Sequence, residues 1–321
     1  MSKKIVVLGG GTGISNLLRG LKRYTEDLTA IVTMMDDGGG SGMIRKELGL
    51  LPPGDIRSCL VALANQSPTM DKVLQYRFTE GGLEGQNFGN LLIVVLNNIY
   101  GTFDRAIKEV SNVLNITGRV LPVTLDNVHL VAKFANGDKC IGESRIPITS
   151  QRLNTSIVGM DMFPEIPYAF SECISAIEEA DIIIIGPGSL YTSIIPNLMV
   201  KGISDAISNS KGKVLMVCNC MTQPGETQGF TVTNHIEAIE QHSYTGIIDY
   251  CMCNTSKPAK DLLSRYEKDN GASEVLLEPK EQKILEQKGV QFILGDFIEE
   301  DSKYIRHDAM KVCEKIFSLF K

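Results

Sequence analysis

The chain opens with a short apolar run that changes abruptly into glycines. Residues 4–8 read Lys-Ile-Val-Val-Leu, and glycines follow at positions 9, 10, 11 and 13. A continuous apolar run of this length is typical of a strand buried on both faces of a parallel sheet. A helix is expected over 13–24 and a second apolar strand over 28–34. This pattern predicts a βαβ unit, the building block of a doubly wound α/β sheet.

Two changes of pattern follow along the chain. Between about residues 52 and 118 the apolar positions repeat with helical spacing, which predicts a helical insertion. Residues 128–134 then alternate between apolar and other positions up to Asn136-Gly137, a dipeptide typical of a tight hairpin turn. We therefore expect a β-hairpin over about 127–147, with residues 139–146 returning antiparallel as an edge or lid feature.

Parallel character returns with four consecutive isoleucines at positions 182–185, which indicate another strand buried on both faces. Further strands are expected at 214–219 and 246–252, and helices at 197–209, 232–241, 258–269 and 307–320. The chain shows no internal repeat, low-complexity segment or linker. Residues 1–321 are therefore interpreted as one α/β domain with a doubly wound, mainly parallel sheet.

Composition and net charge limit the classes of partner that this protein is expected to bind. The 321 residues are 43% hydrophobic and 22% charged, which is ordinary for a globular protein. The formal net charge of −6 argues against a nucleic-acid partner, which would favour a basic face. The aliphatic run at residues 91–96 is too short to span a membrane, and no signal peptide precedes the first strand. We expect a cytoplasmic protein.

The eight cysteines do not follow a metal-ligand pattern. Cys218 and Cys220, like Cys251 and Cys253, are two residues apart inside apolar runs, so each pair shares one face of a predicted strand. Four thiols on neighbouring strands are chemically suited to zinc, but the usual C-x-x-C spacing is absent. Reduced, buried thiols that act as small hydrophobic side chains are the favoured interpretation.

The glycines after the first strand have the character of a phosphate site. Glycine reaches positive φ and allows close approach, and the first N–H groups of the following helix lack partners inside it. Ile14 or Asn16 stands where G-x-G-x-x-G needs its last glycine, so no NAD is expected, and no Lys-Ser or Lys-Thr completes a P-loop. We predict a nucleotide or phosphate cradle made of Gly10, Gly11, Thr12 and Gly13. The alternative is an ordinary glycine-rich turn that binds nothing.

A second loop spans residues 36–42 and begins with two carboxylates. Neighbouring side chains of an extended segment point to opposite sides, so at most one of Asp36 and Asp37 faces a cleft. With Asp55, the cleft-facing carboxylate is suited to hold Mg²⁺ or to act as a general base. The alternative is a simple turn with a cap, because Asp-Gly is a common turn dipeptide.

A third loop, residues 186–193, follows the isoleucine strand and offers hydroxyls and backbone N–H groups at a helix start. Ligands of doubly wound sheets bind at the carboxyl ends of the strands, so the three loops are predicted to meet around a phosphate, a ribose or a base. Helix capping by Ser189 or Thr192 is the alternative. Asn90 either reaches into the same site or caps a helix. No G-x-S-x-G is present, which disfavours a hydrolase.

Taken together, these segments resemble the YvcK-type gluconeogenesis factors of the CofD-like family, which is named for 2-phospho-L-lactate transferase. The resemblance covers nearly the whole chain and rests on GGGTG (9–13), DDGGGSG (36–42), PPGDIR (52–57), FGNL (88–91) and GPGSLYTS (186–193). It implies a three-layer Rossmann-like fold. It also implies a regulator that binds a UDP-sugar such as UDP-N-acetylglucosamine and is needed for cell shape and wall synthesis during gluconeogenic growth.

Tyr266 and Arg306 are assigned a role only by this resemblance, which implies that both contact the UDP-sugar. For Arg306 the role is physically reasonable, because a guanidinium suits a pyrophosphate. Three positions depart from the family pattern, which usually has a serine, an arginine and a histidine where Gly40, Met43 and Gln86 stand. The nucleotide and phosphate contacts predicted from the residues and the resemblance together are Gly10, Gly11, Thr12, Gly13, Gly38, Gly39, Ser41, Asn90, Gly188, Ser189, Tyr191, Thr192, Tyr266 and Arg306.

A CofD-like transferase is the alternative function. In that case Asp36, Asp37 and Asp55 are the predicted catalytic residues, and Asp37 and Asp55 hold Mg²⁺ while a phosphate-linked group moves between a nucleotide and an acceptor. The transferase branch lacks the Gly38 to Gly42 run and Pro-Pro-Gly-Asp, so these segments favour the regulators. A homodimer and protein partners in cell-wall synthesis stay open as interpretations.

Overall fold

Seven parallel strands form the central sheet of the computed structural model, which describes residues 2–299 and 304–320 without the side chains of residues 12, 269 and 270. The strands at the centre of the sheet are buried along their whole length, as the continuous apolar runs predict. In spatial order the strands are β10 (Gln291–Gly295), β9 (Tyr250–Asn254), β8 (Lys213–Val217), β7 (Ile182–Ile185), β1 (Ile5–Gly9), β2 (Leu28–Val32) and β3 (Arg119–Pro122).

The strand order reverses at β1. Strands β2 and β3 extend the sheet on one side of β1, and β7 to β10 extend it on the other side. All of these pairings are parallel, so the expected doubly wound α/β sheet is confirmed. The loops after β1 and β7 flank the point of reversal, which is where open α/β sheets bind ligands.

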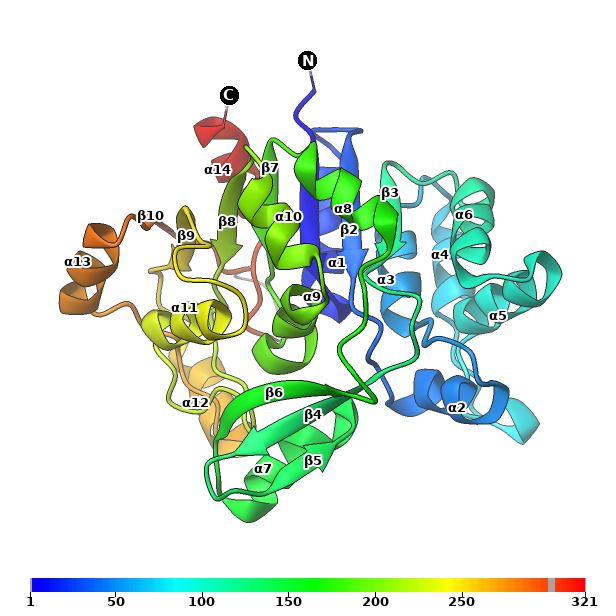
Figure 1. The fold of residues 1–321 in the computed structure, drawn as a ribbon, viewed down its shortest axis with the longest axis horizontal. Coiled ribbons are helices and arrows are strands. Elements are labelled where there is room, and N and C mark those ends of the chain that lie inside the picture. The colour runs from blue at the N-terminus through cyan, green and yellow to red at the C-terminus, as the bar shows by residue number, and fades with distance from the viewer. Residues whose placement is uncertain (1, 300–303, 321) are drawn as a thin grey trace.

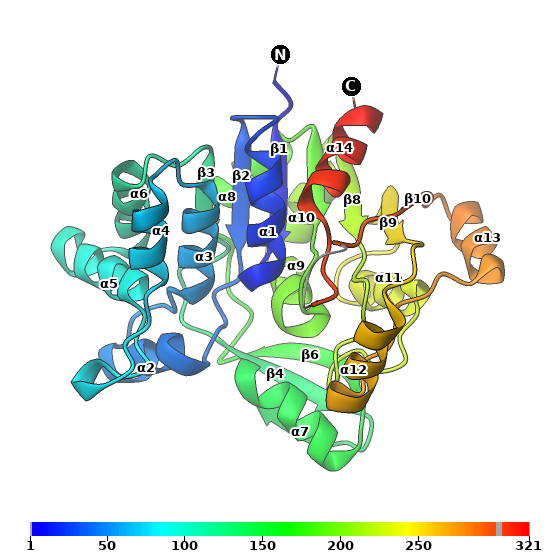
Figure 2. The same cartoon turned by 180° about the vertical axis from the view of Figure 1, so that it is seen from behind.

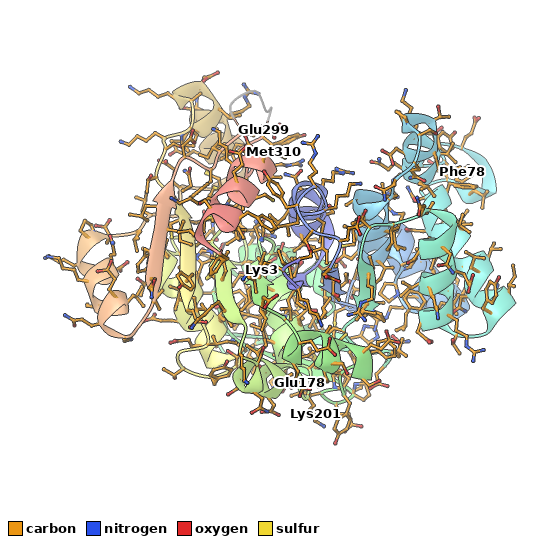
Figure 3. All side chains as sticks on the ribbon, turned by 90° about the horizontal axis from the view of Figure 1, so that it is seen from above. Lys3, Phe78, Glu178, Lys201, Glu299 and Met310 are labelled. Carbon is orange, nitrogen blue, oxygen red and sulfur yellow. The ribbon has the colours of Figure 1, made fainter. Side chains whose placement is uncertain are left out.

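Helices cover both faces of this sheet (Figure 1, Figure 2). Figure 3 looks at the sheet from above and labels Met310 and Glu178 on its opposite sides. The three-layer arrangement implied by the resemblance is confirmed. One face carries α1 (Gly11–Leu21), α3 (Gly54–Leu63) and α14 (Ala309–Leu319), and the other carries α8 (Ser171–Glu178), α9 (Ile195–Met199), α10 (Ile203–Asn209) and α11 (Val232–Gln241).

The segment between β2 and β3 is helical, as predicted for residues 52–118. Its helices begin earlier than expected, because residues 39–42 of the glycine run form the first turn of a helix rather than an open loop. Helix α3 packs along α1, and the last three helices of the segment lie at the β3 end of the sheet (Figure 1). Besides α3, the segment contains α2 (Gly39–Leu48), α4 (Pro68–Gln75), α5 (Phe88–Tyr100) and α6 (Phe103–Val113).

A small antiparallel sheet lies below the carboxyl ends of the central strands (Figure 1). It contains the predicted hairpin, β4 (His129–Phe134) and β5 (Lys139–Ile141), and a third strand, β6 (Ile157–Phe163), that the sequence analysis did not expect. The prediction that the return strand extends to residue 146 is wrong. Residues 143–145 form a 3-10 turn and lead into α7 (Ile146–Leu153), so the pairing stops at Ile141.

Several other elements differ from the expectation. The single helix predicted over 197–209 is two helices, α9 and α10, which are separated at Gly202, where φ is +96°. Strands β3 and β10 and helix α13 (Pro279–Gln287) were not predicted. Helix α12 (Lys260–Asn270) is close to its predicted range.

One cluster of buried apolar side chains spans both sheets and includes Leu8 of β1 and Leu130 of β4. All eight cysteines are free and buried, as expected, and the Sγ atoms of Cys251 and Cys253 lie 3.5 Å apart. Within the described ranges, no helix is both long enough and apolar enough to cross a membrane.

Candidate functional site

The loop after β1 touches the loop after β7. Gly10 is the N-cap of α1, and Gly11 has a φ of +60°, which glycine adopts most readily. A Cβ atom at Gly13 would lie 2.3 Å from the carbonyl oxygen of Pro187, a distance that no side chain tolerates. The glycines therefore allow the two loops to meet at the carboxyl ends of neighbouring strands.

A pocket of about 530 Å³ opens where these two loops meet. Its size is within the range of small-molecule sites. A hollow of about 630 Å³ lies around Lys4 and Asp27, at the amino ends of the strands, where doubly wound sheets do not bind ligands. The pocket between the loops is lined by Gly10, Gly11, Gly13, Asn16, Pro187, Gly188, Ser189, Ser193, Asn219, Cys220, Met221, Gln223, Tyr266, Ile305, Arg306 and His307.

Tyr266 and Arg306 line this pocket although they are distant from both loops in sequence. The hydroxyl of Tyr266, on α12, accepts the N–H of Ile305 at 3.1 Å and so holds the segment that carries Arg306. The guanidinium carbon of Arg306 lies 4.9 Å from the centroid of the Tyr304 ring, and the side chain is exposed. The structure therefore places a cation at the rim of the pocket.

Asp36 and Asp37 point to different partners, as expected for neighbours in an extended segment. Asp36 Oδ1 accepts the N–H of Gly38 at 2.9 Å, at the start of α2. Asp37 accepts the N–H of Ser144 at 2.9 Å, its hydroxyl at 2.7 Å, and the N–H of Glu143 at 3.1 Å. Asp37 thus ties the segment after β2 to the turn after β5.

Asp55, in the first turn of α3, lies against the loop after β1. A Cβ atom at Gly10 would be 2.5 Å from Asp55 Oδ2, and the Gly11 N–H donates to the same carboxyl group. Burial, assisted by the charge of Asp36, raises the pKa of Asp55 to about 7, while the Gly11 N–H and Arg57 act in the opposite direction. The pocket therefore has a neighbouring carboxyl group that exchanges its proton near neutral pH.

The metal pair predicted for the transferase alternative does not converge. Asp37 bonds to the turn after β5, whereas Asp55 faces the glycines after β1. In residues 2–299 and 304–320, no group of three or more His, Cys, Asp or Glu side chains is arranged to hold a metal ion. This geometry does not fit a magnesium ion shared by Asp37 and Asp55, and we assign no chemical step to a metal.

Sequence reasoning missed two further carboxylates in this region. Burial raises the pKa of Glu143 to about 8, and the charges of Asp36, Glu226, Asp37 and Asp55 add to the effect. We call these five residues the carboxylate cluster because the other four charges all act on Glu143, although the five side chains do not converge on one point. Neither Glu143 nor Glu226 belongs to a motif, and only the folded chain brings them together.

Tyr191 and Thr192 are buried and do not line the pocket. The Tyr191 N–H and the Thr192 hydroxyl donate to the carboxyl group of Glu226 at 3.2 and 3.1 Å. Gln223, which does line the pocket, donates from Nε2 to the same group at 2.8 Å. Burial outweighs these bonds and raises the pKa of Glu226 to about 7. Glu226 thus joins the third loop to the segment after β8.

The predicted contacts in the second loop also lie outside the pocket lining. Gly38 caps α2 and Gly39 begins it. The Ser41 hydroxyl oxygen accepts the N–H of Gly54 at 3.1 Å, which holds α2 beside the start of α3. Ligand contact by Gly38, Gly39 and Ser41 stays a prediction.

The side chain of Asn90 binds that of Arg57 and not the pocket. Its Oδ1 accepts the Arg57 Nε–H at 2.9 Å, and the side chain is buried. Asn87, not Asn90, caps α5, because Asn87 Oδ1 accepts the Asn90 N–H at 3.2 Å. The side chain of Thr12 lies outside the described residues.

The three positions that depart from the family pattern form one patch between α2 and the turn before α5. A Cβ atom at Gly40 would lie 3.3 Å from Oε1 of Gln86. Gln86 Nε2 donates to Sδ of Met43 at 2.8 Å. Because the three residues are in contact, a change at one of them alters the surroundings of the other two.

Comparison with known proteins settles the family. The family model described as 2-phospho-L-lactate transferase CofD matches residues 5–298. This chain belongs to the CofD family. The CofD-family chain is 46% identical to the "Putative gluconeogenesis factor" of Thermoanaerobacterium thermosulfurigenes, over 99% of this chain and 97% of that protein. It is 41% identical to the gluconeogenesis factor of Bacillus subtilis (strain 168), over 99% of this chain and 98% of that protein.

The fold of the CofD-family chain is also that of a solved structure. The crystal structure of a UPF0052-family protein from Bacillus halodurans superposes with a TM-score of 0.93 at 42% identity, over 98% of this chain and 99% of that chain. The resemblance to the gluconeogenesis factors of the CofD-like family is therefore confirmed.

In this CofD-family chain, sequence reasoning also missed pocket residues after β8. Asn219 and Gln223 line the pocket from that segment. The rule that ligands bind at the carboxyl ends of parallel strands identified the loops after β1 and β7, and it applies equally to β8. That signal points to Asn219, which comes two residues after Val217, the last residue of the strand.

Proposed function

We propose that this protein is a cytoplasmic regulatory protein that binds a nucleotide-sugar of the UDP-N-acetylglucosamine type and acts in cell shape and wall synthesis during gluconeogenic growth. The observation that carries this proposal is the pocket in which two glycine loops from β1 and β7 meet Tyr266 and Arg306. The gluconeogenesis factors among its relatives support the metabolic role.

The groups around the pocket suit a nucleoside diphosphate carrying a neutral sugar. The first turn of α1 supplies the positive end of a helix dipole, and Arg306 supplies a cation at the rim. Tyr266 offers an aromatic face, and Gln223, whose Nε2 binds Glu226, offers an amide oxygen that recognises a base or sugar hydroxyls. In this arrangement the pyrophosphate lies between the glycine loops and Arg306.

Ligand binding is tested by thermal unfolding and calorimetry with UDP-N-acetylglucosamine, GDP and NADH. A ligand present at about 100 times its Kd stabilises the folded state by about 2.7 kcal/mol. Arg306→Ala is expected to remove most of the UDP-N-acetylglucosamine stabilisation. Arg265→Ala is the matched control, because Arg265 is an exposed arginine of α12 that does not line the pocket. A shift with GDP and none with any uridine nucleotide-sugar would defeat the proposal.

A CofD-like transferase is the second function that an observation favours. Asp55 combines a pKa of about 7 with a position against Gly10 and Gly11, which is the requirement for a general base that acts near neutral pH. In that function Asp55 takes the proton of the acceptor hydroxyl as its oxygen attacks the phosphorus of the phospholactyl group, the phosphoanhydride bond to the nucleotide breaks, and the nucleoside monophosphate leaves. The test is incubation of a guanosine nucleotide that carries 2-phospho-L-lactate on its phosphate with a deazaflavin acceptor. Product formation that Asp55→Asn abolishes supports this function, and absence of product at high protein concentration removes it.

A further inference from the structure

We infer that Asn219 is a positioning residue of the nucleotide pocket, which fixes the Gly188 peptide of the third loop for phosphate binding; this inference rests on the proposed function. Asn219 Oδ1 accepts the Gly188 N–H at 3.2 Å, and Asn219 Nδ2 donates to the Gly188 carbonyl oxygen at 2.8 Å. One side chain therefore satisfies both polar backbone groups of one residue, as a neighbouring strand would.

These two bonds change the role expected of Gly188. Its N–H is already engaged by Asn219 and is not free to bind a phosphate oxygen. What Gly188 contributes is its close approach to the first loop. A Cβ atom at Gly13 would lie 3.1 Å from the Cα of Gly188, and one at Gly188 would lie 3.7 Å from the Gly10 carbonyl oxygen. Any movement of the Gly188 peptide therefore displaces the two glycine loops relative to each other.

A second asparagine also stabilises the contact between the first and third loops. Asn197, on α9, is fully buried, and its Nδ2 donates to the carbonyl oxygens of Gly9 at 3.1 Å and Ser193 at 2.7 Å. The end of β1 and the turn before α9 are thus joined by one amide. Asn219 and Asn197 together form an amide clamp that fixes both loops.

The chemistry at position 219 requires an amide. A carboxylate accepts the Gly188 N–H but cannot donate to the Gly188 carbonyl oxygen, and it places a negative charge on the wall of an anion pocket. An alanine leaves both backbone groups without their partner. Asn219 lines the pocket itself, so its substitution acts on the site directly rather than through the distant core.

The experiment measures the Kd of two probes, UDP-N-acetylglucosamine and uridine, by calorimetry or ligand-observed NMR on the full chain. Asn219→Ala and Asn219→Asp are expected to weaken UDP-N-acetylglucosamine binding by about tenfold or more. Uridine carries no phosphate, so its Kd is expected to stay within about twofold of the wild-type value. A weaker Kd for UDP-N-acetylglucosamine with an unchanged Kd for uridine distinguishes loop positioning from a general loss of structure.

Asn254→Ala is the matched control. Asn254 lies at the carboxyl end of the next strand, β9, and also makes two backbone hydrogen bonds, with the Phe297 N–H at 3.0 Å and the Ser256 carbonyl oxygen at 2.7 Å. It does not line the pocket, so the variant should keep the wild-type Kd for both probes.

Three outcomes overturn the inference. Unchanged Kd values in both Asn219 variants, or an equal loss for uridine and UDP-N-acetylglucosamine, show that Asn219 does not position the phosphate loop. Asn219→Asp keeps one of the two bonds and serves as the test if Asn219→Ala does not fold. Failure of the wild-type protein to bind any uridine nucleotide defeats the proposed function together with this inference, whereas wild-type binding with unchanged variants defeats this inference alone.

Discussion

Glu143 shows how strongly the fold alters a single carboxyl group. Its pKa rises from 4.5 to about 8, so the folded state holds this proton more tightly than the unfolded state does. The resulting stabilisation is complete below the unfolded value and is lost as the pH rises through about 8. Glu143→Gln cannot ionise, so we expect its free energy of unfolding to exceed that of the wild type by about 1 kcal/mol at about pH 9 and to match it near pH 4.

Urea unfolding at both pH values measures this difference. Glu178→Gln serves as the control, because Glu178 is an exposed glutamate of α8 and lies outside the carboxylate cluster. Its stability relative to the wild type should not change with pH. A Glu143→Gln variant that is equally stable relative to the wild type at both pH values contradicts the electrostatic interpretation of the cluster.

Gly13 is the residue at which a single methyl group should separate the two pocket loops. Alanine is the better helix former, but its Cβ would lie 2.3 Å from the Pro187 carbonyl oxygen. We expect Gly13→Ala to lower the free energy of unfolding by about 2 kcal/mol and to weaken nucleotide binding. Thermal unfolding and calorimetry check both effects. Gly82→Ala is the control, since nothing lies within 4 Å of its added methyl group.

At the level of elements, His242 links α11 to the open edge of β6. Its Nε2 accepts the Met160 N–H at 3.0 Å, and its Nδ1 donates to the Ala238 carbonyl oxygen at 2.7 Å. Burial lowers the pKa of His242 from 6.5, so the folded state favours the neutral ring. This contribution to stability is complete above about pH 6.5 and is lost as the pH falls through the folded value.

We therefore expect His242→Ala to lose about 1 kcal/mol of stability at neutral pH and less than that in mild acid, with faster hydrogen exchange confined to β6. Hydrogen exchange followed by mass spectrometry reports both changes. Gln241→Ala removes the neighbouring bond from Nε2 to the Val158 carbonyl oxygen, which is exposed, and should have a smaller effect. Equal exchange in the two variants would argue against the link through His242.

Over the whole molecule, the pocket between the two glycine loops and the carboxylate cluster share a border. Asp55 lies against Gly10 and Gly11, which line the pocket, and its pKa is about 7. Ionisation of Asp55 repels a bound diphosphate, so we expect the affinity for UDP-N-acetylglucosamine to fall severalfold between about pH 6 and 8.5. Asp55→Asn should remove most of this dependence. Calorimetry at both pH values measures it, and an identical pH dependence in the variant excludes Asp55 as its source.

The sequence was sufficient to predict the centre of the fold but not its edges. β1 and β7 are continuous apolar runs and were predicted, whereas β10, Gln291–Gly295, lies at the edge of the sheet and is only partly buried. Its apolar run, Phe292 to Leu294, is only three residues long, too short to distinguish a strand from a turn of helix. β6 was missed because Gly159 and Asp161, which alternate with Met160 and Met162, are residue types that are depleted in strands.

The candidate site also combines residues that the sequence predicts with residues that it does not predict. The glycine loops were predictable because a strand that ends in glycines before a helix has a known chemistry. Tyr266 and Arg306 needed the resemblance to a family. Asn219 was missed although the same strand-end rule points to it after β8. Glu143 and Glu226 depend on pairings between distant segments, and a single sequence does not encode such contacts in any local pattern.

The reversal of strand order at β1 has a consequence for biosynthesis. The first strand leaves the ribosome early, but its neighbour β7 and the pocket residues Tyr266 and Arg306 are translated much later. A nascent chain that stops before these residues contains the segments of the opening βαβ unit but lacks one wall of the pocket. Truncated translation products are therefore expected not to bind the nucleotide-sugar that we propose as the ligand.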